Sequence, residues 1–127
     1  MLQRGRLMKR DNLIADKSKA FAIRIVRLYQ YLTTKKKEYV LSKQVLKSGT
    51  SIGANVKEAI MAQSKADFIA KIQIALKEAS ETEYWIELLM ETDYLSETEG
   101  KSLLDDCQEL IRLGTSILVT AKAQDEK

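Results

Sequence analysis

The chain has 127 residues, 45% of them hydrophobic and 31% charged, which fits a single globular domain, and its formal net charge is +3. Histidine is absent and cysteine occurs once. This excludes an internal disulfide, imidazole catalysis and most zinc or di-iron sites, so we expect no cofactor and no metal. No apolar run approaches the roughly 20 residues of a membrane-spanning helix, and the N-terminus lacks a secretory signal, so we expect a cytoplasmic protein with no membrane partner.

Residues 1–11 are basic and show no hydrophobic periodicity, so we interpret them as a loosely ordered arm. From residue 12 to residue 34 the apolar residues recur at helical spacing and predict a first helix. Its buried stripe is expected to contain Ile14, Phe21, Ile25, Leu28 and Leu32, widened by Val26 and Tyr29. The segment KKKEY then predicts a solvated turn.

Residues 42–62 predict a second helix with Ser42 as its N-cap, and its buried stripe is expected to contain Val45, Ser48, Ile52, Val56 and Ala59. Two glycines interrupt this helix in the stretch SGTSIGANVKEA. A phosphate-binding loop would need a preceding strand and a different glycine spacing. Because each interior glycine costs a helix roughly 1 kcal/mol relative to alanine, we expect the short side chains to admit a neighbouring helix. The residues assigned to this close packing are Ser48, Gly49, Ile52, Gly53 and Val56.

A third helix is expected over residues 64–92, with Ser64 as N-cap and Asp67 in its first turn. Its apolar positions alternate steps of four and three, the heptad spacing of a bundle core. They are Phe68, Ile72, Ala75, Ala79, Thr82, Ile86 and Leu89.

The stretch SETE at residues 96–99 is a capping box, in which the serine caps the Glu99 amide and the glutamate reaches back. It predicts a fourth helix to residue 122, followed by a tail at 123–127, with a stripe of Leu104, Cys107, Ile111, Gly114, Leu118 and Ala121. Cys107 is expected to be a buried apolar residue and not a reactive thiol. Together the elements predict an all-α, antiparallel up-and-down four-helix bundle over residues 12–122.

A second apolar group lies opposite the core stripe of the third helix: Ile74, Trp85 and Leu88, with Ala70 nearby. A monomeric bundle would leave this group in water, and an exposed patch with a tryptophan more often marks an interface. We therefore expect a homo-oligomer. The alternative is that these are scattered surface residues covered by the N-terminal arm.

Charge is distributed unevenly along the chain. Residues 1–47 hold 13 Lys and Arg against 3 Asp and Glu, a net charge of +10, whereas residues 48–127 hold 8 against 15, a net charge of −7. This asymmetry favours an acidic partner such as RNA or DNA, or complementary surfaces that dock between copies. The candidate nucleic-acid contacts are Arg4, Arg6, Lys9, Arg10, Lys17, Arg24, Arg27, Tyr31, Lys35, Lys36 and Lys37. A solvated basic face, or one paired with the acidic helices of a neighbouring copy, explains the same pattern.

An enzyme would have to rely on carboxylates. The candidates are Glu58 with Asn55 on the second helix and Glu83 at the edge of the third-helix stripe, where burial could produce a general base. We expect these polar residues to be structural instead, with the carboxylates accepting hydrogen bonds from Asn55, Ser51 or a helix end. The sequence shows no symmetrical set of four metal ligands, and we predict a protein that is not an enzyme.

The segments SKQVLKSGTSIGANVKEA and DFIAKIQIALKEASETEYWIELL, preceded by KAFAIRIVRLYQYL, resemble the bacterial four-helix-bundle family encoded in intervening sequences of 23S ribosomal RNA genes. The resemblance covers residues 19–118, and its most distinctive parts are the Ser-Ile-x-x-Asn-x-x-Glu run at residues 51–58 and the Ile-Ala-Leu-x-Glu-Ala segment from Ile74. It implies a bundle that assembles as a ring, typically a pentamer, with no established enzymatic activity. The ribosomal label of this family reflects gene location and does not imply ribosome binding.

A distantly related branch, the accessory proteins of diversity-generating retroelements, is also pentameric and binds reverse transcriptase and nucleic acid through a basic surface. Two functions therefore remain open for this chain. One is an assembly module whose ring binds RNA or DNA, and the other is a scaffold that docks a partner enzyme without nucleic acid.

Overall fold

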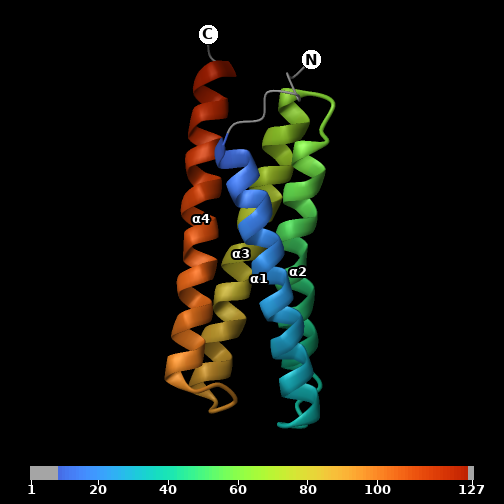
Figure 1. The fold of residues 1–127 in the computed structure, drawn as a ribbon, viewed down its shortest axis with the longest axis vertical. Helices are drawn as coiled ribbons and strands as arrows, with labels where there is room; N and C mark the ends of the chain where they lie inside the picture. Colours follow the sequence, from blue (N-terminus) through green and yellow to red (C-terminus); the bar gives the residue numbers. More distant parts are fainter. Residues whose placement is uncertain (1–8, 126–127) are drawn as a thin grey trace.

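The computed structural model describes residues 9–125. They form four helices: α1 (Lys9–Thr34), α2 (Leu41–Ile60), α3 (Lys65–Glu91) and α4 (Glu97–Asp125). Each helix runs back along the previous one in an elongated bundle, with the α1–α2 and α3–α4 connections at the same end (Figure 1). The predicted all-α up-and-down four-helix bundle is therefore confirmed. Of the helices described, none has the length and apolar character needed to cross a membrane.

The core takes one stripe from each helix. The five residues predicted for α1, from Ile14 to Leu32, are all buried, and so are the seven predicted for α3, from Phe68 to Leu89. The predicted α2 stripe is buried as well, together with Ser42 and Gly49. The pattern of apolar residues thus orients three of the four helices correctly.

Two helices extend beyond their predicted bounds. α1 begins at Lys9 and not at residue 12, and Asp11 lies in its first turn, where the helix dipole favours a carboxylate. α4 continues to Asp125 because Ala123 and Gln124 form helix readily and no proline or glycine stops it. Residues 9–11 and 123–125 are therefore helical, and the remainder of the predicted arm and tail lies outside the described residues.

Two predictions about the core were wrong. Val26 is 38% exposed, because one residue beyond the buried Ile25 the helix has turned by about 100°. The stripe of α4 is rotated from the predicted one, although Cys107, Gly114 and Ala121 are buried. Its other buried residues are Leu103, Leu110 and Ile117, whereas the predicted Leu104, Ile111 and Leu118 are half-buried.

The predicted N-cap of α2 was also wrong. α2 begins at Leu41, and the Glu38 carboxylate accepts hydrogen bonds from the backbone N–H groups of Val40, Leu41 and Ser42 at 3.1, 2.8 and 2.7 Å. Ser42 instead donates its hydroxyl to the Glu38 carbonyl oxygen at 2.9 Å. Burial alone raises the pKa of Glu38, but the three backbone hydrogen bonds and a contribution from the Ser42 side chain together outweigh it, so the pKa lies below its ordinary value of 4.5.

The caps predicted for the other two helices are present. The hydroxyl of Ser64 accepts the Asp67 N–H at 3.0 Å, and that of Ser96 accepts the Glu99 N–H at 3.1 Å. The Glu99 carboxylate accepts a hydrogen bond from the Ser96 hydroxyl at 3.1 Å, whereas the reciprocal bond of a capping box would come from the Ser96 backbone N–H.

Candidate functional site

The two glycines of α2 mark a close approach to α1. A Cβ atom at Gly49 would lie 2.7 Å from Cγ1 of Ile25, and one at Gly53 would lie 3.3 Å from the backbone carbonyl oxygen of Ser18. Residues 41–60 form one continuous helix through both positions. The stretch is thus a surface for helix packing and not a ligand-binding loop. The other residues assigned to it, Ser48, Ile52 and Val56, are buried.

The outward side of α3 carries aromatic and aliphatic residues, which we call the α3 face: Ile74, Tyr84, Trp85 and Leu88. Ile74 is 40% and Tyr84 57% exposed, whereas Trp85 and Leu88 are half-buried. The Trp85 indole N–H donates to Glu81 Oε2 at 3.1 Å, and its ring meets the Tyr84 ring edge to face at 5.1 Å. The sequence placed three of these residues on one face but missed Tyr84, which directly precedes Trp85.

In the folded protein, the basic residues predicted along α1 fall into two groups: some are paired with α4, and others are exposed. Lys17 forms an ion pair with Glu109 at 3.2 Å, and Arg24 forms one with Asp106 at 2.6 Å. The Arg24 guanidinium also donates to the Ser102 hydroxyl at 3.1 Å. These two residues therefore bind α4 of their own chain. From the sequence, pairing between the basic face and acidic helices was considered only between neighbouring copies.

In the rest of the stripe, Arg27 and the three lysines are exposed, whereas Tyr31 is half-buried. Arg27 is exposed and donates to Gln30 Oε1 at 3.1 Å, and Lys36 Nζ lies 6.0 Å from the ring centroid of the half-buried Tyr31. Lys35, Lys36 and Lys37 are exposed, and among the described residues none of them forms an ion pair. Arg4 and Arg6, and the side chains of Lys9 and Arg10, lie outside what the structure describes.

Further basic residues were missed because they lie off the α1 stripe. Lys19 on α1 and Lys43, Lys47 and Lys57 on α2 are exposed, and within residues 11–124 none of the four forms an ion pair. Residues 17–57 contain ten Lys and Arg but only one acidic residue, Glu38, whose buried carboxylate is occupied by the α2 N-terminus. Counting charge over the predicted hairpin, and not along one stripe, would have found these lysines.

Of the polar residues considered for catalysis, Glu58 and Glu83 connect helices. Glu58 pairs with Lys71 of α3 at 2.9 Å, and this hydrogen bond raises the pKa of Lys71. Glu83 accepts a hydrogen bond from Gln108 of α4 at 3.1 Å. Asn55 donates to the Ser51 carbonyl oxygen at 2.8 Å within α2, so the partner of Glu58 is Lys71 and not, as predicted, Asn55, Ser51 or a helix end.

Cys107 is fully buried between α3 and α4. Its thiol donates to the Ala79 carbonyl oxygen at 3.3 Å. Burial, reinforced by the negative charges of Glu83 and Asp106, raises its pKa to about 12. The thiolate, which is the nucleophilic form, is therefore scarce at neutral pH.

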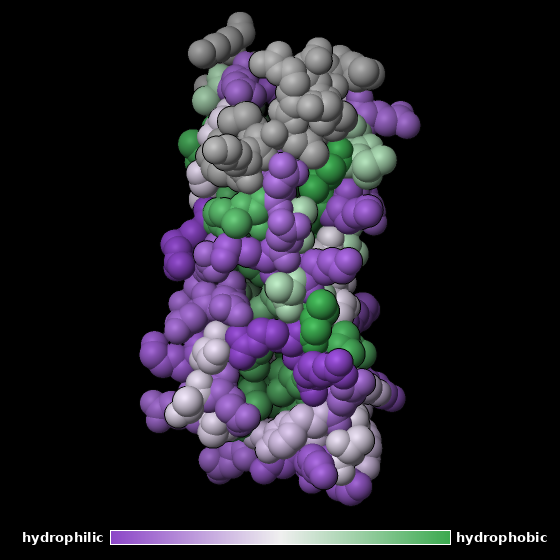
Figure 2. Space-filling model, viewed as in Figure 1, coloured by the Kyte–Doolittle hydropathy of each residue, from purple (hydrophilic) through white to green (hydrophobic). Residues whose placement is uncertain are grey.

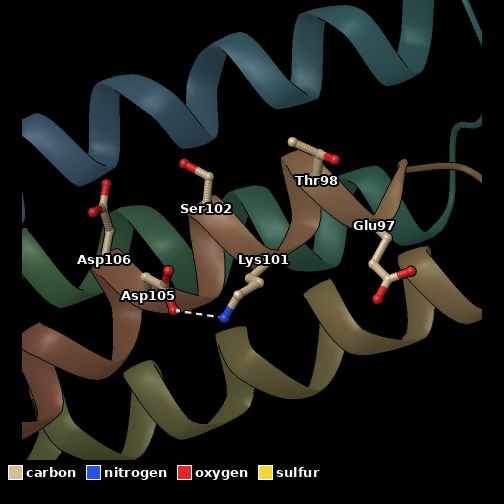
Figure 3. A pocket seen from close by; sticks show the side chains of 6 residues that line it. All are labelled: Glu97, Thr98, Lys101, Ser102, Asp105 and Asp106. Carbon is tan, nitrogen blue, oxygen red and sulfur yellow. Dashed lines mark ion pairs between the residues drawn. The ribbon is translucent and has the colours of Figure 1, made fainter.

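The face shared by α1 and α4 is largely hydrophilic, with a hollow over its lower half (Figure 2). Residues of α4 alone line a hollow near its N-terminus: Glu97, Thr98, Lys101, Ser102, Asp105 and Asp106. Thr98, Ser102 and Asp106 lie on the side of α4 toward α1, whereas Lys101 pairs with Asp105 at 3.8 Å (Figure 3). Ser102 and Asp106 already bind Arg24. Over the part of the chain described, no three Cys, Asp or Glu side chains are grouped so that they could hold a metal ion.

Comparison with known proteins agrees with this geometry. The family model described as 23S rRNA-intervening sequence protein matches residues 10–116. A solved structure is also similar, that of a protein with unknown function from the S23 ribosomal protein family of Bacteroides thetaiotaomicron VPI-5482. It is 55% identical in sequence with a TM-score of 0.85, and the match covers 86% of this chain and 97% of that chain. No curated protein matches the chain.

The family match begins within α1 and ends within α4, so it includes all four helices. It also contains the α2 and α3 motifs from which the resemblance was inferred. The chain therefore belongs to the 23S rRNA-intervening sequence protein family.

Proposed function

We propose that the protein is a non-catalytic module that assembles with copies of itself into a ring and presents a basic surface to nucleic acid. The observation that carries the assembly is the α3 face, where Ile74 and Tyr84 are 40% and 57% exposed beside Trp85. Tryptophan and tyrosine supply much of the binding energy in protein interfaces. The family resemblance makes a pentamer the expected ring.

Light-scattering mass in solution tests the assembly. We expect the wild-type mass to be a multiple of the 14.4 kDa chain, and Ile74→Glu to shift it toward one chain, because a buried carboxylate without a partner opposes association. Trp85→Glu should act in the same direction. Since Trp85 also packs against the core, the more exposed Ile74 gives the cleaner variant.

Val119→Glu is the matched control. It places the same charge on a valine of α4 that is 64% exposed and lies outside the α3 face, so its mass should equal that of the wild type. A wild-type mass of one chain would refute the assembly. A wild-type mass retained by Ile74→Glu would move the interface away from the α3 face.

The nucleic-acid part of the proposal is supported by the charge of residues 17–57, where one acidic residue accompanies ten basic ones. Contacts to phosphate are sequence-independent and weaken as salt rises. A ring would repeat the basic surface, so that weak contacts add through avidity.

The alternative is a scaffold that docks a partner enzyme without nucleic acid. Titration of RNA or DNA with the protein at several salt concentrations separates the two functions. Affinity at low salt no higher than that of an uncharged helical bundle would favour the scaffold.

A further inference from the structure

We infer that single-stranded nucleic acid binds at the turn end of the α1–α2 hairpin, through phosphate contacts from the turn and from the outward side of α2. This inference rests on the proposed nucleic-acid function and gives it a location and a ligand class. We call the location the turn surface and define it by Lys35, Lys36, Lys37, Tyr39, Lys43 and Lys47.

The ion pairs of α1 shift the expected contacts toward the turn. Lys17 and Arg24 already hold carboxylates of α4 at 3.2 and 2.6 Å, so binding a phosphate through either one would first require breaking an ion pair. The five lysines of the turn surface are exposed, and across the described chain they have no such partner. Their charge is therefore available to a ligand.

Within the hairpin, acidic residues near the turn surface are few, whereas Glu91, Asp93, Glu97 and Glu99 flank the α3–α4 connection at the same end of the bundle. Residues 39–57 contain no Asp or Glu, and the Glu38 carboxylate is directed at three backbone N–H groups of α2. Lys43 and Lys47 are four residues apart in α2, so their side chains lie on the same side of the helix, one turn apart. The lysines of the turn and those of α2 are therefore close in sequence and all exposed, and we assign them to one basic surface.

The turn itself is fixed by hydrogen bonds. The Glu38 N–H donates to the Leu32 carbonyl oxygen at 2.9 Å, and that of Lys35 donates to Tyr31 at 2.8 Å. Lys37 adopts a left-handed conformation with φ of 56°. Because the backbone is held in this way, its lysines are presented from a defined position, which reduces the ordering that a ligand must impose.

The exposed side chain of Tyr39 favours a single-stranded ligand over a duplex. It is 53% exposed and lies between the lysines of the turn and those of α2 in the sequence. Surfaces that bind single strands combine basic side chains with aromatic rings on which unpaired bases stack. Bases of a duplex are already stacked on one another, so an exposed tyrosine gives a duplex no equivalent contact.

Fluorescence anisotropy with a labelled 20-nucleotide oligo(dT), and with a duplex of the same length, tests the inference. Contacts from all five lysines would give a slope of log affinity against log salt of about −3.5. Lys43→Gln/Lys47→Gln should weaken oligo(dT) binding roughly tenfold at low salt and reduce the steepness of the slope by about 1.4. Tyr39→Ala should weaken binding of oligo(dT) and leave binding of the duplex unchanged.

Lys19→Gln/Lys57→Gln is the matched control, because it removes the same charge from exposed, unpaired positions away from the turn. It should change oligo(dT) affinity less than twofold. Equal losses in the two double variants would overturn the turn surface while leaving nucleic-acid binding by the hairpin intact. Duplex affinity equal to or above that for oligo(dT) would overturn the single-strand assignment.

Two further results would also be decisive. Absence of wild-type binding at low salt would overturn this inference together with the nucleic-acid part of the proposed function. A lower light-scattering mass for Lys43→Gln/Lys47→Gln would assign these lysines to contacts between copies, and would likewise overturn the inference. Thermal unfolding followed by circular dichroism establishes that each variant is folded.

Discussion

Glu38 and Glu58 have the same side chain but stabilise different parts of the bundle. Glu38 is 8% exposed and accepts hydrogen bonds from three N–H groups at the start of α2. Glu58 is largely exposed and forms an ion pair with Lys71 across α2 and α3. Exposed ion pairs are weakened by solvent screening and contribute little, whereas a capping side chain contributes about 0.5–2 kcal/mol. Glu38 is therefore the carboxylate on which stability depends more.

Glu38→Gln should lower the free energy of unfolding by about 1 kcal/mol at pH 7, because the amide keeps an acceptor oxygen but loses the charge. The folded pKa of Glu38 is depressed below 4.5. Its ionised form therefore adds stability above that pH, and the contribution is lost as pH falls through the folded pKa. Urea denaturation at pH 7 and near pH 3 should show the difference between wild type and variant shrinking in acid.

Glu99→Gln is the control for this titration. The exposed Glu99 carboxylate accepts a hydrogen bond from the Ser96 hydroxyl, in place of the three backbone N–H groups that Glu38 binds, so the substitution should change stability by less than half as much. An equal loss for Glu38→Gln at both pH values would contradict the role assigned to the charge.

At the scale of the helix, α2 contains two glycines and several hydroxyl residues, which favour helix formation less than alanine does. The hydroxyl groups of Thr50 and Ser51 donate hydrogen bonds to the carbonyl oxygens four residues earlier in α2, at 2.7 and 2.6 Å. Gly49 and Gly53 let α1 approach more closely than a methyl group would allow. The intrinsic helix propensity of α2 is therefore lower than that of an alanine-containing helix, and its close packing against α1 compensates for the loss.

Gly49→Ala tests whether the close packing with α1 outweighs the gain in helix propensity. The added Cβ would lie 2.7 and 2.8 Å from Cγ1 and Cγ2 of Ile25, which is fully buried and β-branched and so has little freedom to move. Overpacking of this kind costs about 1–3 kcal/mol, more than the roughly 1 kcal/mol gained from helix propensity. We expect a net loss of stability of about 1 kcal/mol in urea denaturation.

Gly100→Ala provides the comparison in α4. There the obstacle is the unbranched Met90 side chain, which the added Cβ would meet at Cγ and Sδ; because this side chain has more rotamers than Ile25, the variant should lose less stability than Gly49→Ala. A stabilised Gly49→Ala protein would show that the contact with Ile25 relaxes easily.

The sequence predicts the buried stripes of α1, α2 and α3 correctly, although α3 carries a second apolar group as well. It fails on α4, where apolar residues occur in adjacent pairs, such as Leu103 with Leu104 and Leu110 with Ile111. Two parallel stripes then have the same seven-residue spacing, and only packing against α3 and α1 decides which one is buried. Ser42 was similarly misassigned, since local preference favours serine as an N-cap but Glu38 reaches more N–H groups.

At the scale of the whole molecule, charge is divided between two hairpins. The α1–α2 hairpin is basic and the α3–α4 hairpin is acidic, and they meet again where α1 lies beside α4, the least extensive of the four neighbouring helix contacts. Arg24 and Asp106 pair there across 82 positions of sequence. The basic stripe of α1 was therefore predictable from spacing, but the loss of Lys17 and Arg24 to α4 was not, because it depends on tertiary contact.

The rate at which the Cys107 thiol is labelled measures unfolding of the whole bundle. It is fully buried, and a pKa of about 12 leaves a thiolate fraction of about 10⁻⁴ at pH 8. A thiol reagent should therefore react only after α3 and α4 separate. With a free energy of unfolding of about 5 kcal/mol or more, labelling should be at least about 10³-fold slower in the native protein than in the urea-unfolded one, and faster in Gly49→Ala than in wild type. Native labelling as fast as that of the unfolded chain would show that the α3–α4 contact opens without unfolding of the bundle.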